Sequence, residues 1–329
     1  MGLTELMVQK TAPRWLIWVA LWTVYLIWGS TYLAIRIMVR TLPPLLSGGL
    51  RFLLAGLILL GVLIVSRGAA AVTIGPRELI SCTVIGTTLL LGANGLVSIA
   101  EERVPSALAA LVIASIPLWV VLLRSIFDGR VPRGTLVGVA VGFVGVGILV
   151  VPGSSSSGAP IAGLLVLLIA AVCWASGSFM STKLTLPRDP LVSTGFQMLS
   201  GGVVMTVVAL AAGEAADFHT SQLSRSSVLA FAYLVVAGSL LAFTAYSWLL
   251  RNAPISKVAT YAYVNPVVAI FLGWWILNER ITASVLIGAA VILSSVAFIV
   301  RKESVPRQEP EPEAASASHN LAAPDPAKI

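Results

Sequence analysis

The stretch "VPSALAALVIASIP" at residues 104–117 returns in altered form as "APISKVATYAYVNP" at residues 253–266. Each stretch holds two prolines twelve residues apart, and the two pairs are offset by 149 residues: Pro105 and Pro117, then Pro254 and Pro266. A helix rises ~1.5 Å per residue, so twelve residues cover ~18 Å, just past the middle of a ~30 Å hydrocarbon layer. The second proline of each pair removes a backbone donor and bends a helix. The pattern therefore indicates a repeated unit with a helix breaker near mid-depth.

Charged residues are too few for a soluble protein and leave long stretches empty. They make up 11% of the 329 residues, against roughly 25% in soluble domains. Each empty stretch approaches the ~20 residues that a membrane-spanning helix needs. Eight of them lie at 15–35, 41–66 (interrupted by Arg51), 79–100, 104–123, 190–213, 226–250, 258–278 and 281–300. The run 134–182 supplies two more, because Pro, Gly and Ser at 152–160 form a loop. The sequence thus predicts an all-α polytopic membrane protein with ten transmembrane helices.

A nearly constant offset divides the chain into two halves. Further matches at offsets of 146 to 149 residues are Trp28 with Trp174, Pro44 with Pro190, Arg51 with Gln197, and Ala93 with Ala242. We expect a first five-span repeat at 15–150, an external linker at 151–160 and a second repeat at 161–300. A unit with five spans re-enters from the opposite side, so the two repeats have inverted topology, as in many secondary transporters.

The segments outside the spans set the orientation. With the N-terminus inside, inner segments carry fifteen Lys and Arg residues and outer segments carry five, which predicts cytoplasmic termini. The net charge of +7 is therefore a topology signal, and we expect no nucleic-acid partner. The N-terminus is expected at 1–14, and the Pro-, Glu- and Ala-rich tail at 301–329 is expected to be disordered. The first apolar segment is too long for a cleavable signal peptide.

Cysteine and histidine give no sign of a disulfide, metal site or cofactor. Cys82 and Cys173 lie inside predicted spans, where a thiol behaves as a small buried hydrophobe. His219 lies in an outer loop and His319 in the tail, and neither has neighbours suited to a metal. We therefore expect no bound metal and no cofactor.

Four segments together resemble the EamA family of the drug/metabolite transporter superfamily, in particular its YedA-like bacterial branch. They are "WGSTYLAIR" (28–36), "PPLLSGGLRFLLAG" (43–56), "VPSALAALVIASIPLW" (104–119) and "TYAYVNPVVA" (260–269). The resemblance covers about residues 15–300. It implies a ten-helix inverted-repeat carrier of the bacterial inner membrane that exports amino acids or other small metabolites. It leaves the substrate open.

The polar groups before Pro266 are candidates for solute binding. Tyr261 and Asn265 are four residues apart and share a helix face, with Tyr263 between them. Asn265 in hydrocarbon needs a partner, so it bonds to another helix or meets the solute. The twin stretch has only Val112, Ala114 and Ile116 at these positions. Pro117 and Pro266 either bend two helices around a solute path or merely form packing kinks.

Three further groups lie at depth. Trp28 and Trp174 are too deep for an interfacial belt, so they line a cavity or pack in the core, and each indole N–H needs an acceptor. Ser30 and Tyr32 add hydroxyls on the first span. Arg51 is an intramembrane charge. It either holds a substrate carboxylate or pairs with helix-end carbonyls or with Glu101 or Glu102.

The absence of certain residues and motifs from the sequence limits how transport can be driven. No Asp or Glu lies in mid-span, and Glu101, Glu102 and Glu279 fall near the outer surface. Proton coupling through a mid-membrane carboxylate is therefore not supported, while coupling through an edge carboxylate stays open. No G-x-x-x-x-G-K-[ST] loop is present, which argues against ATP-driven transport. Small faces at Gly138, Gly142, Gly145 and Gly288 serve helix packing or a homodimer, so monomer and dimer both stay open.

We therefore predict a non-ATP secondary transporter for a small-molecule solute, working by alternating access. The alternatives are a transporter-fold sensor or scaffold without flux, and a multidrug efflux carrier. The spans hold no Asp pair, Ser/His pair or H-E-x-x-H motif, so a membrane enzyme is not expected.

Overall fold

The structure is a computed structural model that describes residues 13–129, 131–150, 160–216, 218, 221 and 223–303. Helices are the only regular elements in these ranges. Nine of them are long and apolar enough to cross a membrane, and α13 (Tyr261–Leu277) is a shorter apolar helix. With α12 (Ile255–Val258) before it, α13 forms the tenth span. The predicted all-α membrane protein with ten spans is confirmed.

Five spans precede the linker region and five follow it. The first five are α1 (Arg14–Met38), α2 (Pro44–Arg67), α3–η2–α4 (Pro76–Gly86, Thr87–Gly95 and Leu96–Ala100), α5–α6 (Ser106–Ile113 and Ile116–Phe127) and α7 (Arg133–Val150). The other five are α8 (Ile161–Ser181), α9 (Pro190–Ala211), α10–η4–α11 (Arg225–Tyr233, Leu234–Leu241 and Ala242–Asn252), α12–α13 and α14 (Ala283–Glu303). A short 3₁₀ helix, η1 (Ala69–Val72), follows α2.

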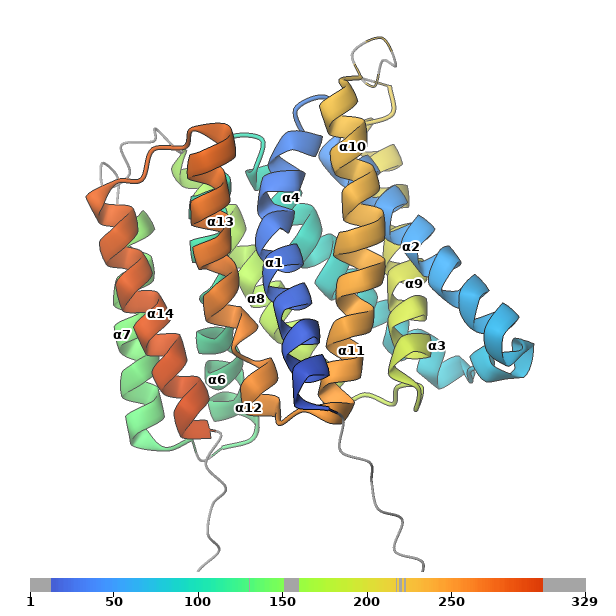
Figure 1. Cartoon of the computed structure of the whole chain (residues 1–329), viewed down its shortest axis with the longest axis horizontal. Helices are drawn as coiled ribbons and strands as arrows, with labels where there is room; N and C mark the ends of the chain where they lie inside the picture. The colour runs from blue at the N-terminus through green and yellow to red at the C-terminus, as the bar shows by residue number, and fades with distance from the viewer. Residues whose placement is uncertain are drawn as a thin grey trace, which may run out of the picture.

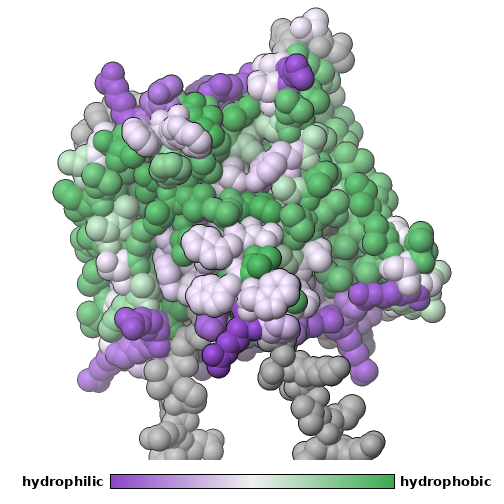
Figure 2. Space-filling model, in the orientation of Figure 1, coloured by the Kyte–Doolittle hydropathy of each residue, from purple (hydrophilic) through white to green (hydrophobic). Residues whose placement is uncertain are grey.

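The spans stand side by side, and the start of α1 and the end of α14 lie at the same end of the bundle (Figure 1). We call this the terminal end of the bundle, and the other, where α4 ends and α5 begins, the opposite end. Figure 2 shows hydrophobic side chains across the middle and hydrophilic ones at both ends. This distribution fits a bilayer around the bundle.

The order of elements in the first half recurs in the second. The third span of each half is an α-helix that turns into a π-helix and back, with η2 in one and η4 in the other. The fourth span of each half is interrupted, between α5 and α6 at residues 114–115 and between α12 and α13 at residues 259–260. Most close contacts join the halves: α1 packs on α13 and α11, and α8 packs in the same way on α6 and η2.

The two prolines differ in their place. Pro117 is the second residue of α6, directly after the interruption of the fourth span. The helix α13 continues through Pro266, and the interruption of its span lies about two turns earlier. A kink at Pro266 therefore stays a prediction.

Carboxylates from distant segments satisfy two helix N-termini at the opposite end. Glu214 accepts hydrogen bonds from Leu45 N (3.2 Å) and Leu46 N (2.8 Å) at the start of α2. Glu279 accepts from Ser106 N (2.8 Å) and Ala107 N (3.0 Å) at the start of α5. The first N–H groups of a helix lack partners within it and carry partial positive charge, so both carboxylates are well placed.

Glycine lets neighbouring helices approach closely. A Cβ on Gly56 of α2 would lie 2.7 Å from the backbone nitrogen of Leu199 in α9. The four glycines considered for a dimer interface lie between α7 and α14 or next to Leu118, where a Cβ on Gly145 would lie 2.9 Å from Ile292 Cγ1. All four glycines thus contact other helices of the same chain, as expected if they serve helix packing within the protein.

Several sequence-based predictions concern residues outside the described ranges. They are the N-terminus up to residue 12, the linker at 151–159, the tail from residue 304, and His219 and His319. In the described part of the chain both cysteines are free thiols, and no group of three His, Cys, Asp or Glu could hold a metal ion.

We predict that Gly56→Ala lowers stability while Gly61→Ala, on the same helix, does not. Nothing lies within 4 Å of a Cβ on Gly61, whereas one on Gly56 meets backbone atoms that cannot turn aside. Overpacking costs ~1–3 kcal/mol, while Ala in place of Gly stabilises a helix by ~0.5–1 kcal/mol. Thermal unfolding midpoints in detergent should fall for Gly56→Ala and hold or rise for Gly61→Ala. A midpoint at or above wild type for Gly56→Ala would contradict the packing.

Candidate functional site

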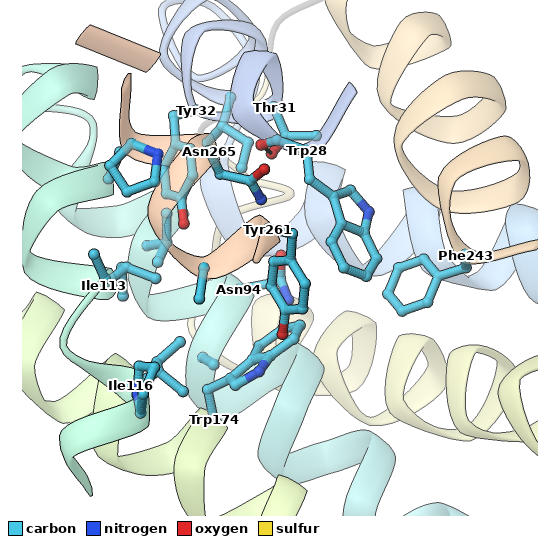
Figure 3. Close-up of a pocket in the computed structure, with 18 of the residues that line it drawn as sticks. Trp28, Thr31, Tyr32, Asn94, Ile113, Ile116, Trp174, Phe243, Tyr261 and Asn265 are labelled. Atoms are coloured by element: carbon cyan, nitrogen blue, oxygen red, sulfur yellow. Dashed lines mark hydrogen bonds between the residues drawn. The ribbon is translucent and has the colours of Figure 1, made fainter. Parts of the chain in front are cut away.

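A cavity lies between the two halves, near the middle of the bundle. Its volume is about 130 Å³, below the ~300–1,000 Å³ of most small-molecule sites. Its walls come from α1, α2, η2, α4, α5, α6, α8, α11 and α13. Most of the lining is apolar or aromatic, with a few polar groups among it (Figure 3).

Most predicted site residues meet in this cavity. The lining includes Trp28, Tyr32, Arg51, Trp174, Tyr261, Asn265, Pro117 and Pro266. Ser30 and Tyr263 do not belong to it. Ser30 Oγ donates to Ile27 O (2.8 Å) and contacts Tyr233 Oη (2.6 Å), while Tyr263 packs against the main hydrophobic core. Each lies two residues from a lining residue, and two residues turn a helix by ~200°, so both face away.

The lining repeats between the halves. Five pairs at offsets of 146 or 149 residues all face the cavity: Trp28 with Trp174, Asn94 with Phe243, Ile113 with Ala262, Ile116 with Asn265, and Pro117 with Pro266. Equivalent backbone positions therefore surround the cavity, but two of the five pairs, Asn94 with Phe243 and Ile116 with Asn265, set a polar side chain against an apolar one. An asymmetric solute can thus have different groups on its two sides.

Aromatic rings form one wall. The Trp28 ring lies 5.0 Å from Phe243, 5.1 Å from Tyr246 and 5.3 Å from Tyr261, measured between centroids. The indole Nε1 donates to Gly238 O at 3.3 Å, which supplies the acceptor a buried indole needs. Trp28 therefore packs in an aromatic cluster and also lines the cavity. Figure 3 shows Trp28, Phe243 and Tyr261 around the same space.

Asn265 links α13 to α1 while facing the cavity. With its amide nitrogen turned toward the two carbonyls, Nδ2 donates to Tyr261 O (3.2 Å) and Tyr25 O (3.3 Å). The helices meet closely here, since a Cβ on Gly29 would lie 2.6 Å from Val268 Cβ. Asn265 therefore forms the predicted hydrogen bond to another helix. Because it also lines the cavity, contact with a solute stays a prediction.

Arg51 places a positive charge in the wall. Its side chain is buried, Nε donates to Ser239 Oγ of η4 (2.9 Å), and Cζ lies 4.5 Å from the Phe52 ring centroid. The pairing with Glu101 or Glu102 is not formed, and no carboxylate of the described residues makes an ion pair with Arg51. Hydrocarbon does not stabilise a lone cation, so an intramembrane arginine without a carboxylate partner is unusual.

Among the lining residues that sequence reasoning did not select, three had a signal in the sequence. Asn94 is a lone amide in a charge-free span, like Asn265. Phe243 is its partner at offset 149, and Thr31 lies three residues after Trp28 on the same face. Asn94 Nδ2 donates to Leu89 O at 3.1 Å, five residues back, as the π-helical turn allows.

These features define a polytopic membrane protein with a largely apolar cavity between two five-span halves. The sequence model described as the EamA-like transporter family matches residues 14–151 and again residues 161–301. Because the two matches cover most of the chain, the protein belongs to this family. The family is one of transporters.

Relatives agree with this membership. The chain is 38% identical over 281 residues to the uncharacterized inner membrane transporter YedA of Escherichia coli (strain K12), covering 85% of this chain and 89% of YedA. It is 25% identical over 283 residues to a probable amino-acid metabolite efflux pump of Salmonella typhimurium, covering 83% and 91%. A solved structure titled "Crystal structure of protein" superposes with a TM-score of 0.60 at 19% identity, over 87% of this chain and 97% of that one. This last likeness shows the fold alone.

Cysteine labelling tests the lining without knowledge of the solute. In a Cys82→Ser, Cys173→Ser background, we predict that Asn94→Cys reacts fast with a charged methanethiosulfonate reagent. A thiol reacts as its thiolate, which forms in water, so Tyr263→Cys and Ser30→Cys should react much more slowly. The rates are read by mass spectrometry of the full-length protein in nanodiscs. Equal rates at all three positions would refute the assigned faces.

Proposed function

We propose that the protein is a secondary carrier that exports amino acids with apolar or aromatic side chains across a bacterial inner membrane. The observation that carries the proposal is that the Arg51 guanidinium and the aromatic cluster around Trp28 face one cavity between the two halves. The name of the Salmonella relative points to the same class of solute.

An amino acid matches the cavity in three parts. Its carboxylate accepts charge-assisted hydrogen bonds from Arg51. Its apolar side chain packs against Trp28, Phe243 and Tyr261, where burial of apolar area stabilises the complex. Its ammonium group finds the carbonyl oxygen of Asn94 and the faces of the aromatic rings.

Contacts at the two ends of the bundle support the proposed alternating access. At the opposite end, the Glu279 carboxylate connects the segment after α13 to the start of α5. At the terminal end, two exposed ion pairs join the halves: Asp189 with Arg67 (2.8 Å), and Asp128 with Lys183 (2.6 Å). Asp189 also pairs with Arg251 of its own half (3.3 Å). Exposed ion pairs contribute only ~0–1 kcal/mol each, so breaking them costs little. We propose that the two sets of contacts open in turn as the halves rock.

The multidrug alternative fits the cavity less well. Cationic drugs need an anionic or apolar wall, whereas the described lining contains a guanidinium and no carboxylate. A sensor or scaffold without flux has the same fold, and transport assays separate it from a carrier.

We predict that Arg51→Gln lowers transport of L-phenylalanine much more than transport of its amide, L-phenylalaninamide. A hydrogen bond to a charged group contributes ~1.5–3 kcal/mol, so kcat/KM for the acid should fall roughly 10- to 100-fold. Counterflow of radiolabelled solute into proteoliposomes measures this, with Arg77→Gln, an exposed residue in the first turn of α3, as the control. If acid and amide lose activity equally, Arg51 does not hold the carboxylate. If the wild type shows no saturable flux of L-phenylalanine or L-leucine, the proposed solute class is wrong.

We also propose that the terminal end faces the cytoplasm. Arg77 and Arg103 are exposed at the two different ends of the bundle. In the cysteine-free background, an impermeant maleimide should label Arg103→Cys in intact spheroplasts and Arg77→Cys only after lysis. The reverse pattern would invert the proposed orientation.

A further inference from the structure

Glu101 is a buried carboxyl group without a hydrogen-bond donor. It follows α4, directly after the span Pro76–Ala100, and its side chain has no solvent exposure. Within the described residues neither of its side-chain oxygens has a hydrogen-bond partner. Arg36 of α1 donates to the backbone carbonyl of Glu101 and not to the carboxyl group. An ionised carboxylate in such a place would carry an uncompensated desolvation cost.

Two other carboxylates at the same end are treated differently. Glu279 accepts from three donors: Ser106 N, Ser106 Oγ and Ala107 N. Glu214 accepts from Leu45 N and Leu46 N. Both lie at helix N-termini, whose partial positive charge stabilises the ionised form, whereas Glu101 lies at the C-terminal end of α4, where the helix dipole disfavours a negative charge. Of these three carboxyl groups, only Glu101 lies in surroundings that favour the protonated, neutral form.

The surroundings of Glu101 contain charges of both signs. The groups that face it are Tyr32 and Arg36 from α1, Glu279 from the segment between α13 and α14, and its chain neighbours Glu102 and Arg103. The helix α8, which packs on α4, contributes no charged residue, and the buried cation of α2, Arg51, is bonded to Ser239. Burial raises the pKa of Glu101 well above its usual range, and the neighbouring Glu279 raises it further, while Arg36 only partly offsets them.

One face of α1 connects the cavity to this carboxyl group. Trp28, Tyr32 and Arg36 are spaced four residues apart and so lie on one side of the helix. Trp28 and Tyr32 line the cavity, and Arg36 touches the residue that carries the carboxyl group. A rotation of α1 that opens the cavity therefore also changes the surroundings of Glu101.

We propose that Glu101 is a proton-binding site at the opposite end of the bundle, protonated while that end is closed and ionised when it opens. The proton comes from water and binds one carboxyl oxygen, and it returns to water when opening lets water solvate the carboxylate. No other bond changes. As a coupling device this rests on the proposed function, because a proton bound in one conformation and released in the other is exchanged for solute.

The first test needs no solute. A carboxyl group whose pKa is raised by folding stabilises the fold below its unfolded pKa of about 4.3, and this stabilisation is lost as pH rises through the folded pKa. The variant Glu101→Gln stays neutral, so its unfolding midpoint relative to wild type should rise steadily between about pH 5 and about pH 8. Glu102→Gln, one residue away and exposed, should not show this rise. Glu279→Gln should lower the midpoint, because its carboxylate caps α5. A midpoint difference between Glu101→Gln and wild type that is independent of pH overturns the proposal.

The second test concerns coupling. In proteoliposomes, a pH gradient should drive accumulation of L-phenylalanine by the wild type and not by Glu101→Gln, while counterflow without a gradient is retained in both. Gradient-driven accumulation that persists in Glu101→Gln overturns the coupling. Absence of counterflow in the wild type contradicts the proposed function instead, and the unfolding measurements still decide whether Glu101 binds the proton.

Discussion

Hydrocarbon provides no hydrogen bonds, and this constraint accounts for most of the architecture. Every polar group in the span region needs a partner inside the protein. Helices satisfy their own backbones, and the first N–H groups of α2 and α5 receive carboxylates from Glu214 and Glu279. The same constraint limits where a helix can be irregular. Both interrupted spans, α5–α6 and α12–α13, contribute residues beside their breaks to the cavity wall.

The π-helical segments follow the same logic. A π-turn leaves backbone groups out of the regular ladder and is common at functional sites. In η4, Gly238 O accepts from the Trp28 indole and Ser239 Oγ accepts from Arg51. The π-helical segment of one half thus holds two side chains of the other half in place, one through a backbone carbonyl and one through a side-chain hydroxyl. The cavity depends on these cross-contacts, because neither half closes it alone.

The sequence predicts the spans well because charge marks their ends. Arg67 closes α2, and Lys183 follows the end of α8 within two residues. The repeat likewise predicts that Trp28 and Trp174 lie at one site, because equivalent positions of the two halves face the same cavity. The break at residues 259–260 has no proline or glycine at it, and Tyr25 Oη bonds to Thr260 Oγ1 there, so tertiary contacts set its place. Arg51 could not be assigned its partner either, because Ser239 lies on a helix 188 residues away in the chain.

Ser30 and Tyr263 show where reasoning from composition alone fails. A hydroxyl group in an apolar span needs a hydrogen-bond partner wherever it lies. That partner can be a nearby backbone carbonyl as well as a solute, and Ser30 bonds to a carbonyl of its own helix. The useful discriminator is the helical phase relative to a residue already placed in the cavity. Glu101 extends the argument, because it has neither a local partner nor a distant one and no exposure to water. An ionised carboxylate that lacks hydrogen bonds and water in one conformation is unstable there. It is stabilised either by taking up a proton or by a second conformation that exposes it to water, and a transporter that changes conformation allows both.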